Sequence, residues 1–332
     1  LSSDPEQSWR VTEADWRHLA LHDRFVSSGE RVVTETSTAQ APWIVIEGAD
    51  KRYRELAVGR ALLQALRHHQ KKMRKEEQER KPEAPSLAAA KKRSKTRKLS
   101  VLGEIDLSQS LDKDRYAEEL ERAQGRLARL SRAAHRERRP TIAVFEGWDA
   151  AGKGGAIRRV TAALDARMYR VVPIAAPNDE ELAHHYMWRF VRHLPRAGHI
   201  TLFDRSWSGR VLVERVEGLA TKEEWQRAYR EINVFERELA QGGLRIAKFW
   251  LQIDKDEQLR RFKEREKIPY KNYKITADDY RNREKWALYE EAVDEMLSRT
   301  DTSWAPWTRV AANNKRHARI QILDRLGDVL EP

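Results

Sequence analysis

The 332-residue sequence contains no cysteine, so it can form neither a disulfide framework nor a thiolate metal site. It has no apolar run long enough to span a bilayer, and its first stretch, LSSDPEQSW, lacks the apolar core of a signal peptide. These absences favour a cytoplasmic protein without a membrane partner. Because the chain starts at Leu1 rather than Met, we expect it to be a fragment of a longer protein.

The charge of the chain is unbalanced. Its 64 lysine and arginine residues exceed its 52 aspartate and glutamate residues, which gives a formal net charge of +12 at pH 7. This excess favours a polyanionic partner such as nucleic acid, polyphosphate or an anionic surface, and charge alone does not choose among them. The length fits two domains, or one full core with a partial second one, and leaves a homo-oligomer open.

An ungapped internal repeat links the two ends of the chain. With Thr12 aligned on Thr276, the two Ala-Pro-Trp motifs of the sequence coincide. Each copy predicts a long helix, a loop ending in this motif, a short strand and a closing amphipathic helix. The segments around the motif are TSTAQAPW at 36–43 and TDTSWAPW at 300–307, and the expected strands are 44–46 and 308–310.

The repeat predicts three parts. Residues 1–68 are interpreted as the C-terminal remnant of a first domain copy, with two unrelated helices of similar composition as the alternative. Residues 69–100 are charged and poor in large apolar residues, as expected of a basic linker without a fixed fold. Residues 101–332 are expected to form a complete domain, which an amphipathic helix at about 112–134 introduces.

The segment TIAVFEGWDAAGKGGAIRRV is typical of a phosphate-binding loop. It predicts a buried strand at 141–145, a glycine-rich turn, and a helix that opens near Lys153. Backbone N–H groups of such a turn close around an anion, the helix N-terminus adds partial positive charge, and the lysine reaches the transferred phosphoryl group. The glycines of the turn are Gly147, Gly152, Gly154 and Gly155.

Two carboxylates are candidate ligands of Mg²⁺. The usual loop ends in Gly-Lys-Ser or Gly-Lys-Thr, whose hydroxyl binds the metal, whereas here Gly154 follows Lys153. Asp149, inside the loop, is the replacement that we expect, and its alternative role is to form a turn. Asp204 ends the expected strand of HITLFDRSW and is the second ligand. Arg205 follows it, either to clamp a phosphate oxygen or to hold a loop.

The helix DEQLRRFKEREK is a candidate basic lid. Its spacing predicts that Phe262 is buried, that Arg261 and Arg265 point outward one turn apart, and that Lys263 lies beside them. Such a lid closes over phosphates and excludes water, and the alternative is an exposed helix balanced by its glutamates. Two weaker candidates are Arg189, as a contact of the acceptor, and residues 313–316.

Residues 101–332 closely resemble the polyphosphate kinase 2 family. The resemblance is carried by GWDAAGKGG, which has the family's glycine after the loop lysine, by FDRSW, and by RRFKEREK. It implies an α/β P-loop kinase fold with a parallel sheet sandwiched between helices and a helical lid. It also implies Mg²⁺-dependent phosphoryl transfer between inorganic polyphosphate and a nucleotide. The residues to which it assigns roles are Asp149, Lys153, Asp204, Arg205, Arg261, Lys263 and Arg265.

The repeat sharpens this expectation, because the AMP-using members of the family resemble two fused copies. The resemblance therefore implies transfer from polyphosphate to AMP, giving ADP. The alternatives are an ATP-dependent nucleoside monophosphate kinase on the same fold and a basic nucleic-acid-binding or regulatory module with an inactive loop. We expect no nucleic-acid partner, because no motif that reads nucleic acid accompanies the loop. Ser208 stands where members often carry tyrosine, a departure that bears on the local acceptor contacts.

Overall fold

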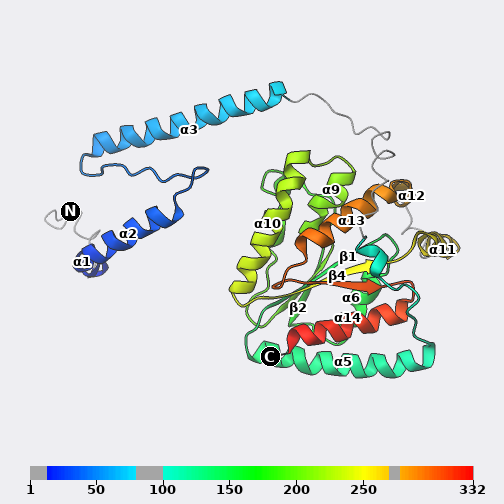
Figure 1. The fold of residues 1–332 in the computed structure, drawn as a ribbon. Coiled ribbons are helices and arrows are strands. Elements are labelled where there is room, and N and C mark those ends of the chain that lie inside the picture. Colours follow the sequence, from blue (N-terminus) through cyan, green and yellow to red (C-terminus); the bar gives the residue numbers. More distant parts are fainter. Residues whose placement is uncertain (1–12, 80–99, 269–276, 332) are drawn as a thin grey trace. The chain divides into compact units, whose positions relative to one another are not determined.

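The structure, a computed structural model, describes residues 13–79, 100–268 and 277–331. The chain divides into two compact units, Leu1–Ser86 and Leu87–Pro332 (Figure 1). Among the described residues, no helix combines the length and the apolar character that crossing a membrane requires.

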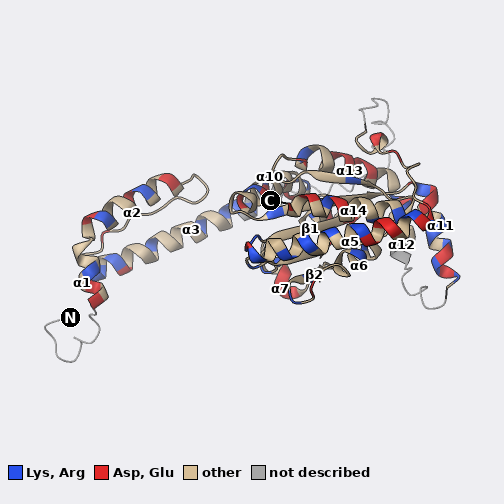
Figure 2. Cartoon of the chain, turned by 90° about the horizontal axis from the view of Figure 1, so that it is seen from below, with Lys and Arg blue, Asp and Glu red and all other residues tan. Residues whose placement is uncertain are grey.

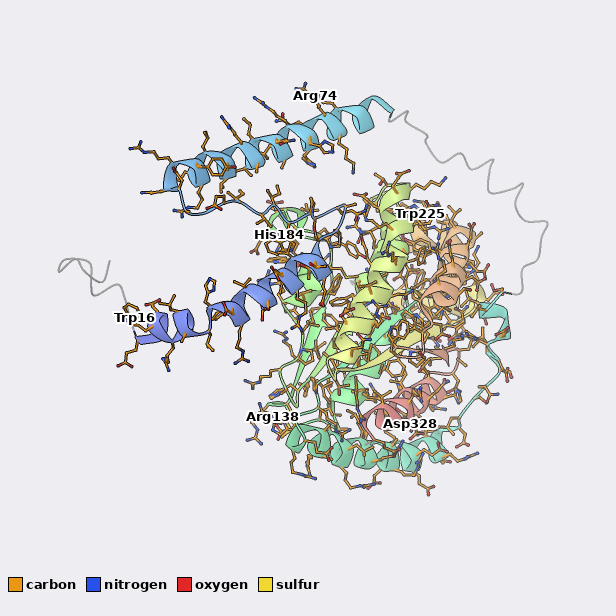
Figure 3. The ribbon with its side chains drawn as sticks, turned by 60° about the vertical axis from the view of Figure 1, so that its left-hand side comes forward. Trp16, Arg74, Arg138, His184, Trp225 and Asp328 are labelled. Carbon is orange, nitrogen blue, oxygen red and sulfur yellow. The ribbon has the colours of Figure 1, made fainter. Side chains whose placement is uncertain are left out.

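The first unit is helical in its described part. It contains α1 (Glu13–Ala20), α2 (His22–Thr36) and α3 (Lys51–Glu79). Helices α1 and α2 bury no residue. Trp16 of α1, labelled in Figure 3, is an example of their exposed side chains.

Two expectations for this unit are wrong. Residues 44–46 form no strand, because a strand needs a neighbouring strand for its backbone groups and the described part of this unit offers none. Residues 69–79 continue α3 instead of forming a linker without structure, because lysine, arginine, glutamate and glutamine lose little rotamer freedom in a helix. The rest of the expected linker, apart from Ser100, lies outside the described residues.

The second unit is built on a five-stranded, fully parallel sheet with the strand order β2-β3-β1-β4-β5. The central strand β1 is a nearly continuous apolar run, as expected of a strand covered on both faces. The predicted α/β fold is confirmed. The strands are β1 (Thr141–Gly147), β2 (Tyr169–Pro173), β3 (Ile200–Asp204), β4 (Arg245–Gln252) and β5 (Trp307–Ala311).

Helices cover both faces of this sheet (Figure 1). On one face α5, α6 and α14 pack together, and on the other lie α9, α10 and α13. The helical elements of this unit are η2 (Leu102–Glu104), α5 (Lys113–Arg136), α6 (Lys153–Thr161), α7 (Asp179–Leu182), α8 (Trp188–Val191), η3 (Trp207–Val211), α9 (Val213–Val216), α10 (Lys222–Gln241), α11 (Lys255–Glu266), α12 (Ala277–Glu284), α13 (Trp286–Thr300) and α14 (Lys315–Leu330).

The outer layer formed by α5 and α14 is joined by ion pairs as well as apolar contacts. Asp328, labelled in Figure 3, accepts a hydrogen bond from Nη2 of Arg126 at 2.8 Å. Leu127 of α5 and Leu326 of α14 are fully buried. The helix expected at about 112–134 is therefore confirmed as α5, and it closes the core beneath the sheet.

The helices of the repeated segments correspond in the two units. Under the shift that aligns Thr12 with Thr276, α1 and α2 begin and end where α12 and α13 do, and α3 begins where α14 does. A side-chain hydrogen bond recurs as well. The indole Nε1 of Trp43 donates to Oγ1 of Thr36 at 2.7 Å, and Nε1 of Trp307 donates to Oγ1 of Thr300 at 2.9 Å.

Candidate active site

The glycine-rich turn joins the end of β1 to the start of α6, as the sequence predicts. Gly147 has φ +149°, and a Cβ there would come within 2.6 Å of the carbonyl oxygen of Leu251, so no other residue fits. Gly152 precedes the helix with φ +115°. A Cβ on Gly154 would meet no atom within 4 Å, which leaves that side of the turn open. We call residues 147–155 the phosphate loop, after the role that the sequence predicts for them.

Lys153 folds back over the phosphate loop. Its Nζ donates to the carbonyl oxygens of Gly147 at 2.7 Å and Trp148 at 3.2 Å. Burial lowers the pKa of Lys153, while the nearby carboxylates of Asp149 and Asp204 oppose that shift. The ammonium group is thus held at the loop with three acidic neighbours, of which Glu146 is the third.

Asp149 and Arg205 meet across the site. An oxygen of Asp149 lies 3.4 Å from Nη2 of Arg205, and its other oxygen accepts a hydrogen bond from Nδ2 of Asn282 at 3.2 Å. Asn282 comes from α12, and sequence reasoning missed it because nothing in its neighbourhood marks it as part of a site. The carboxylate of Asp149 faces the space between the loop and α12 rather than only its own turn.

Asp204 ends β3 beside the phosphate loop. It is in register with Phe145 of β1, so both strands end at the same edge of the sheet, where parallel α/β sheets bind ligands. The next residue, Arg205, has φ +71° and donates its backbone N–H to the carbonyl oxygen of Phe145 at 3.0 Å. This left-handed conformation is uncommon outside glycine and sends the arginine side chain toward Asp149.

Glu146 holds this turn, and sequence reasoning missed it. Its carboxylate accepts hydrogen bonds from the backbone N–H of Ser206 at 2.7 Å and from the Ser206 hydroxyl at 2.8 Å. Burial raises the pKa of Glu146, and these hydrogen bonds oppose the shift. An acidic residue inside the apolar run TIAVFEG was the available signal, because a buried carboxylate needs specific partners.

Asp149 and Asp204 fit a bound Mg²⁺ in the chemistry of their donor atoms. Magnesium commonly takes one or two carboxylates and completes its shell with water and substrate phosphate oxygens. Both carboxylates act on the same lysine of the phosphate loop. The described residues contain no cluster of three or more histidine, aspartate or glutamate side chains arranged to enclose a metal. Two carboxylates are the number that such a metal takes from the protein when substrate phosphates complete its shell.

The expectation that Arg261 points outward from the lid helix is wrong. The helix is α11, and Arg261 is 1% exposed, with its guanidinium turned toward the protein interior. The physical reason is that four backbone carbonyl oxygens and the carboxylate of Glu257 surround it and replace its hydration. Lys263 is exposed and Arg265 is half-buried, while Phe262 is buried as expected. Lysine and arginine alternate with glutamate along α11 in Figure 2.

The side chain of Arg189 likewise binds protein groups close to it. Its Nη2 donates to the carbonyl oxygen of Ala175 at 2.8 Å and lies 3.2 Å from the carboxylate of Glu181. Its Nε is buried and has no partner among the described residues. Ser208 is buried in η3, and its backbone N–H donates to the hydroxyl of Ser206.

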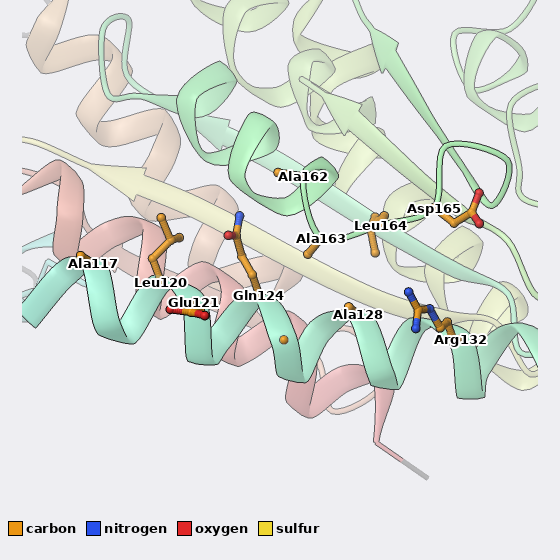
Figure 4. A pocket seen from close by; sticks show the side chains of 11 residues that line it. Ala117, Leu120, Glu121, Gln124, Ala128, Arg132, Ala162, Ala163, Leu164 and Asp165 are labelled. Atoms are coloured by element: carbon orange, nitrogen blue, oxygen red, sulfur yellow. The ribbon is translucent and has the colours of Figure 1, made fainter.

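A cavity of about 560 Å³ lies elsewhere, between α5 and the segment 162–165 (Figure 4). Its lining includes Ala117, Leu120, Gln124 and Asp165. None of the predicted site residues lines it. The cavity is therefore separate from the phosphate loop and its acidic neighbours.

Comparison with known proteins agrees with this geometry. The profile of the family described as Polyphosphate kinase 2 (PPK2) matches residues 2–74 and 110–331. The chain is 52% identical to a Polyphosphate:AMP phosphotransferase of Pseudomonas aeruginosa and 50% identical to one of Pseudomonas syringae pv. tomato. Each match covers 100% of this chain and 65% of the relative, so the chain spans about two thirds of the length of these proteins.

Comparison with solved structures also indicates polyphosphate kinase 2. The crystal structure described as putative polyphosphate kinase 2 from P. aeruginosa matches with a TM-score of 0.79 and 50% sequence identity, covering 96% of this chain and 65% of that one. Polyphosphate Kinase 2 from Arthrobacter aurescens TC1 matches with a TM-score of 0.66 and 34% identity, covering 69% of this chain and 84% of that one. The chain belongs to the polyphosphate kinase 2 family.

Proposed function

We propose that this chain forms part of a Mg²⁺-dependent enzyme that transfers the terminal phosphoryl group of inorganic polyphosphate to AMP, giving ADP. One observation carries the proposal. Lys153 of the phosphate loop lies among Asp149, Asp204 and Arg205 at the edge of the sheet. The names of the relatives, which are polyphosphate:AMP phosphotransferases, support the same donor and acceptor.

The site acts by positioning and by stabilising charge. An oxygen of the AMP phosphate forms a bond to the terminal phosphorus of polyphosphate, and the bridging P–O bond breaks, so that the shortened polyphosphate leaves with the negative charge. The attacking oxygen is already ionised near neutral pH, so no general base is required. The loop N–H groups and Lys153 bind the transferred phosphoryl, and Arg205 binds a neighbouring oxygen. Mg²⁺ held by Asp149 and Asp204, when bound, offsets the charge of the phosphates.

Cations outside the phosphate loop extend the proposed site. We propose that Lys263 and Arg265 of α11 carry charge toward the polyphosphate chain and that Arg189 contacts the acceptor. Arg319 of α14 approaches the loop at 3.5 Å from the position that a Cβ of Gly155 would take. Glycine at 154 and 155 keeps the backbone open to the anion.

We also propose the domain organisation that the repeat indicates. Residues 1–68 are the C-terminal part of a first kinase-like copy, residues 69–100 are a basic linker, and residues 101–332 are the complete kinase domain. The matching boundaries of the helices in the two copies support this division, as does a family profile that matches both 2–74 and 110–331.

Donor choice tests the proposed reaction most directly. Initial rates are measured with long-chain polyphosphate and with ATP, each offered with AMP and Mg²⁺, and with K153A as the control for contaminating kinases. We expect ADP to form from polyphosphate. Efficient transfer from ATP without transfer from polyphosphate would instead favour a nucleoside monophosphate kinase, and no transfer from either donor would favour a binding module.

Acceptor choice is tested separately with one polyphosphate preparation. We expect kcat/KM for AMP to exceed that for ADP several-fold, because a second acceptor phosphate adds negative charge next to the end of the polyphosphate. A preference for ADP would remove the AMP assignment and leave the polyphosphate donor in place. Ser208 is the residue to exchange for tyrosine if the acceptor preference is weak.

A further inference from the structure

Arg261 uses every one of its hydrogen-bond donors inside the protein. Nη1 donates to the carbonyl oxygens of Ala150 and Ala151, both at 2.9 Å. Nη2 donates to those of Ala312 at 2.6 Å and Asn313 at 2.9 Å. Nε donates to the Glu257 carboxylate. A guanidinium has five N–H donors, so none remains for a substrate phosphate.

The same helix holds a third carbonyl of the phosphate loop. Nε2 of Gln258 donates to the carbonyl oxygen of Asp149 at 3.1 Å, and the Gln258 side chain is buried. Residues 149, 150 and 151 therefore all present their carbonyl oxygens to α11. Lys153 takes the two preceding carbonyls of the loop, at 147 and 148. Each carbonyl oxygen from 147 to 151 thus has a side-chain donor.

We propose that Arg261 and Gln258 are positioning residues, which keep the phosphate loop in its anion-receiving conformation by holding its carbonyl oxygens away from the ligand. A carbonyl dipole facing a phosphate would repel it, whereas a loop whose carbonyls are held elsewhere can present N–H groups. The inference rests on the proposed function for its kinetic part, because it assumes that the loop binds polyphosphate.

The contacts that Arg261 and Gln258 make with the loop, which we call the brace, act where the backbone is strained. Ala150 has φ +63°, a left-handed conformation that costs energy in any residue with a Cβ and persists only where its surroundings hold it. Its carbonyl oxygen is one of the two that Nη1 of Arg261 binds. The arginine therefore holds the loop at its strained position.

The far end of the brace is fixed to the sheet. Ala312 and Asn313 directly follow β5, and the backbone N–H of Ala312 donates to the carbonyl oxygen of Gln252 at the end of β4. The Asn313 side chain donates to the carboxylate of Asp254, which caps the start of α11. The phosphate loop, α11 and the turn after β5 are thus joined through one buried side chain.

Three variants of the full chain test this brace. R261K keeps the charge, but three donors on one nitrogen do not reach four carbonyls in two separate turns, so the brace is lost. Q258M removes one donor at nearly constant volume. R260A is the matched control, because Arg260 is the exposed neighbour on α11 and pairs only with Glu257 and Glu264 among the described residues.

Two readouts are collected for each variant. The first is kcat and KM for polyphosphate and AMP. The second is amide hydrogen exchange in residues 147–155, compared with exchange in β4 of the same sample. The exchange readout needs no activity, so it tests the brace even if the proposed reaction is wrong. A residue that only stabilises the fold would lower protection throughout the domain and leave kcat of the folded fraction unchanged.

We expect R261K to lower kcat by about 10²-fold, because small misplacements of a reacting group have effects of this order. We expect Q258M to lower it by up to about tenfold, the effect of one hydrogen bond, and R260A to change it by less than about twofold. Loop amides should exchange faster in R261K and Q258M while β4 stays protected. If R261K does not fold, Q258M decides. Loop exchange as slow as in the wild type in every folded variant would overturn the proposal. So would a kcat of folded R261K equal to that of R260A, when the wild-type chain is active with polyphosphate and AMP.

Discussion

Residues 13–66 and residues 277–330 carry corresponding helices and the same tryptophan–threonine hydrogen bond, yet their apolar side chains lie in different environments. Trp43 is 56% exposed in the first unit, and its counterpart Trp307 is 6% exposed in the second. Trp307 opens β5, which pairs with β4, whereas residues 43–47 pair with no strand in the described part of the chain. Local sequence is therefore sufficient for the helices and the turn, and burial depends on a neighbouring sheet.

A buried ion pair adds to the difference between the environments of Trp307 and Trp43. Nζ of Lys248, on β4, lies 2.7 Å from the carboxylate of Glu236 and donates to the carbonyl oxygen of Thr300 at 2.8 Å. It also lies 4.8 Å from the centroid of the Trp307 ring. Burial lowers the pKa of Lys248 and raises that of Glu236, and each charge opposes the shift of the other. The second copy thus contacts Lys248, a residue that belongs to the neighbouring strand of the sheet.

The largest difference between the copies should appear when the shared tryptophan is removed. We expect W307A to lower the free energy of unfolding of its unit by about 3–5 kcal/mol, because a large buried side chain leaves a cavity. We expect W43A to cost less than about 1 kcal/mol, the net value of one hydrogen bond. Guanidinium unfolding followed by circular dichroism compares the two. Equal losses would mean that the first copy is buried as deeply as the second.

Catalytic substitutions test whether the second unit carries the chemistry. We expect K153A and D204N each to lower kcat by about 10²–10³-fold, because each removes a preorganised group that stabilises charge. Both variants should keep the circular dichroism spectrum of the wild type. A variant that kept more than about a tenth of the wild-type kcat would remove its residue from the catalytic assignment.

Threonine substitutions give a smaller and more local comparison. Thr300 is fully buried, and T300V would leave Nε1 of Trp307 without its acceptor, so we expect a loss of about 1–3 kcal/mol in the free energy of unfolding. T36V removes the corresponding acceptor of Trp43 in an exposed setting, where water replaces it, and should cost less than about 0.5 kcal/mol. Thermal unfolding of both variants checks this, and a larger loss for T36V would reverse the comparison.

Removing the first copy should have the smallest effect on chemistry. Residues 1–68 contain no phosphate loop and no acidic strand end, so we expect the shortened chain to keep kcat within about twofold of the full chain. Steady-state rates with polyphosphate and AMP provide the measurement, and circular dichroism provides the control for folding. A folded but inactive shortened chain would give the first copy a catalytic role.

The elements that sequence patterns predict best are those that local physics specifies. The apolar run before Gly147 predicted β1, and the glycine-rich turn after it predicted the start of α6 at Lys153. The register of the two Ala-Pro-Trp motifs predicted helices that correspond in both copies. The strand expected at 44–46 was wrong, because that prediction assumed a partner strand that the described residues of its unit do not contain.

The predicted site residues show the same division between local signals in the sequence and contacts made only in the fold. Asp204 and Arg205 were predicted as site residues because a carboxylate at the end of a buried strand is a local signal. Arg261 was assigned to the wrong face of its helix, because a period of 3.6 residues places neighbours on a surface without saying which surface is covered. Glu146 was missed although an acidic residue inside an apolar run is a signal, and Asn282 had no motif to mark it, so only its partner identifies it.

The sequence by itself determined the strand, the glycine-rich turn and the helix that opens at Lys153, and it determined the helices of the repeat, because spacing and residue type act over a few positions of the chain. The tertiary structure alone decided where Arg261 points. The carbonyl oxygens that bind it come from residues 150, 151, 312 and 313, which are far apart along the chain and meet only when the sheet is complete. A buried guanidinium takes the direction in which all its donors are satisfied, and that direction depends on which distant carbonyls the fold brings together.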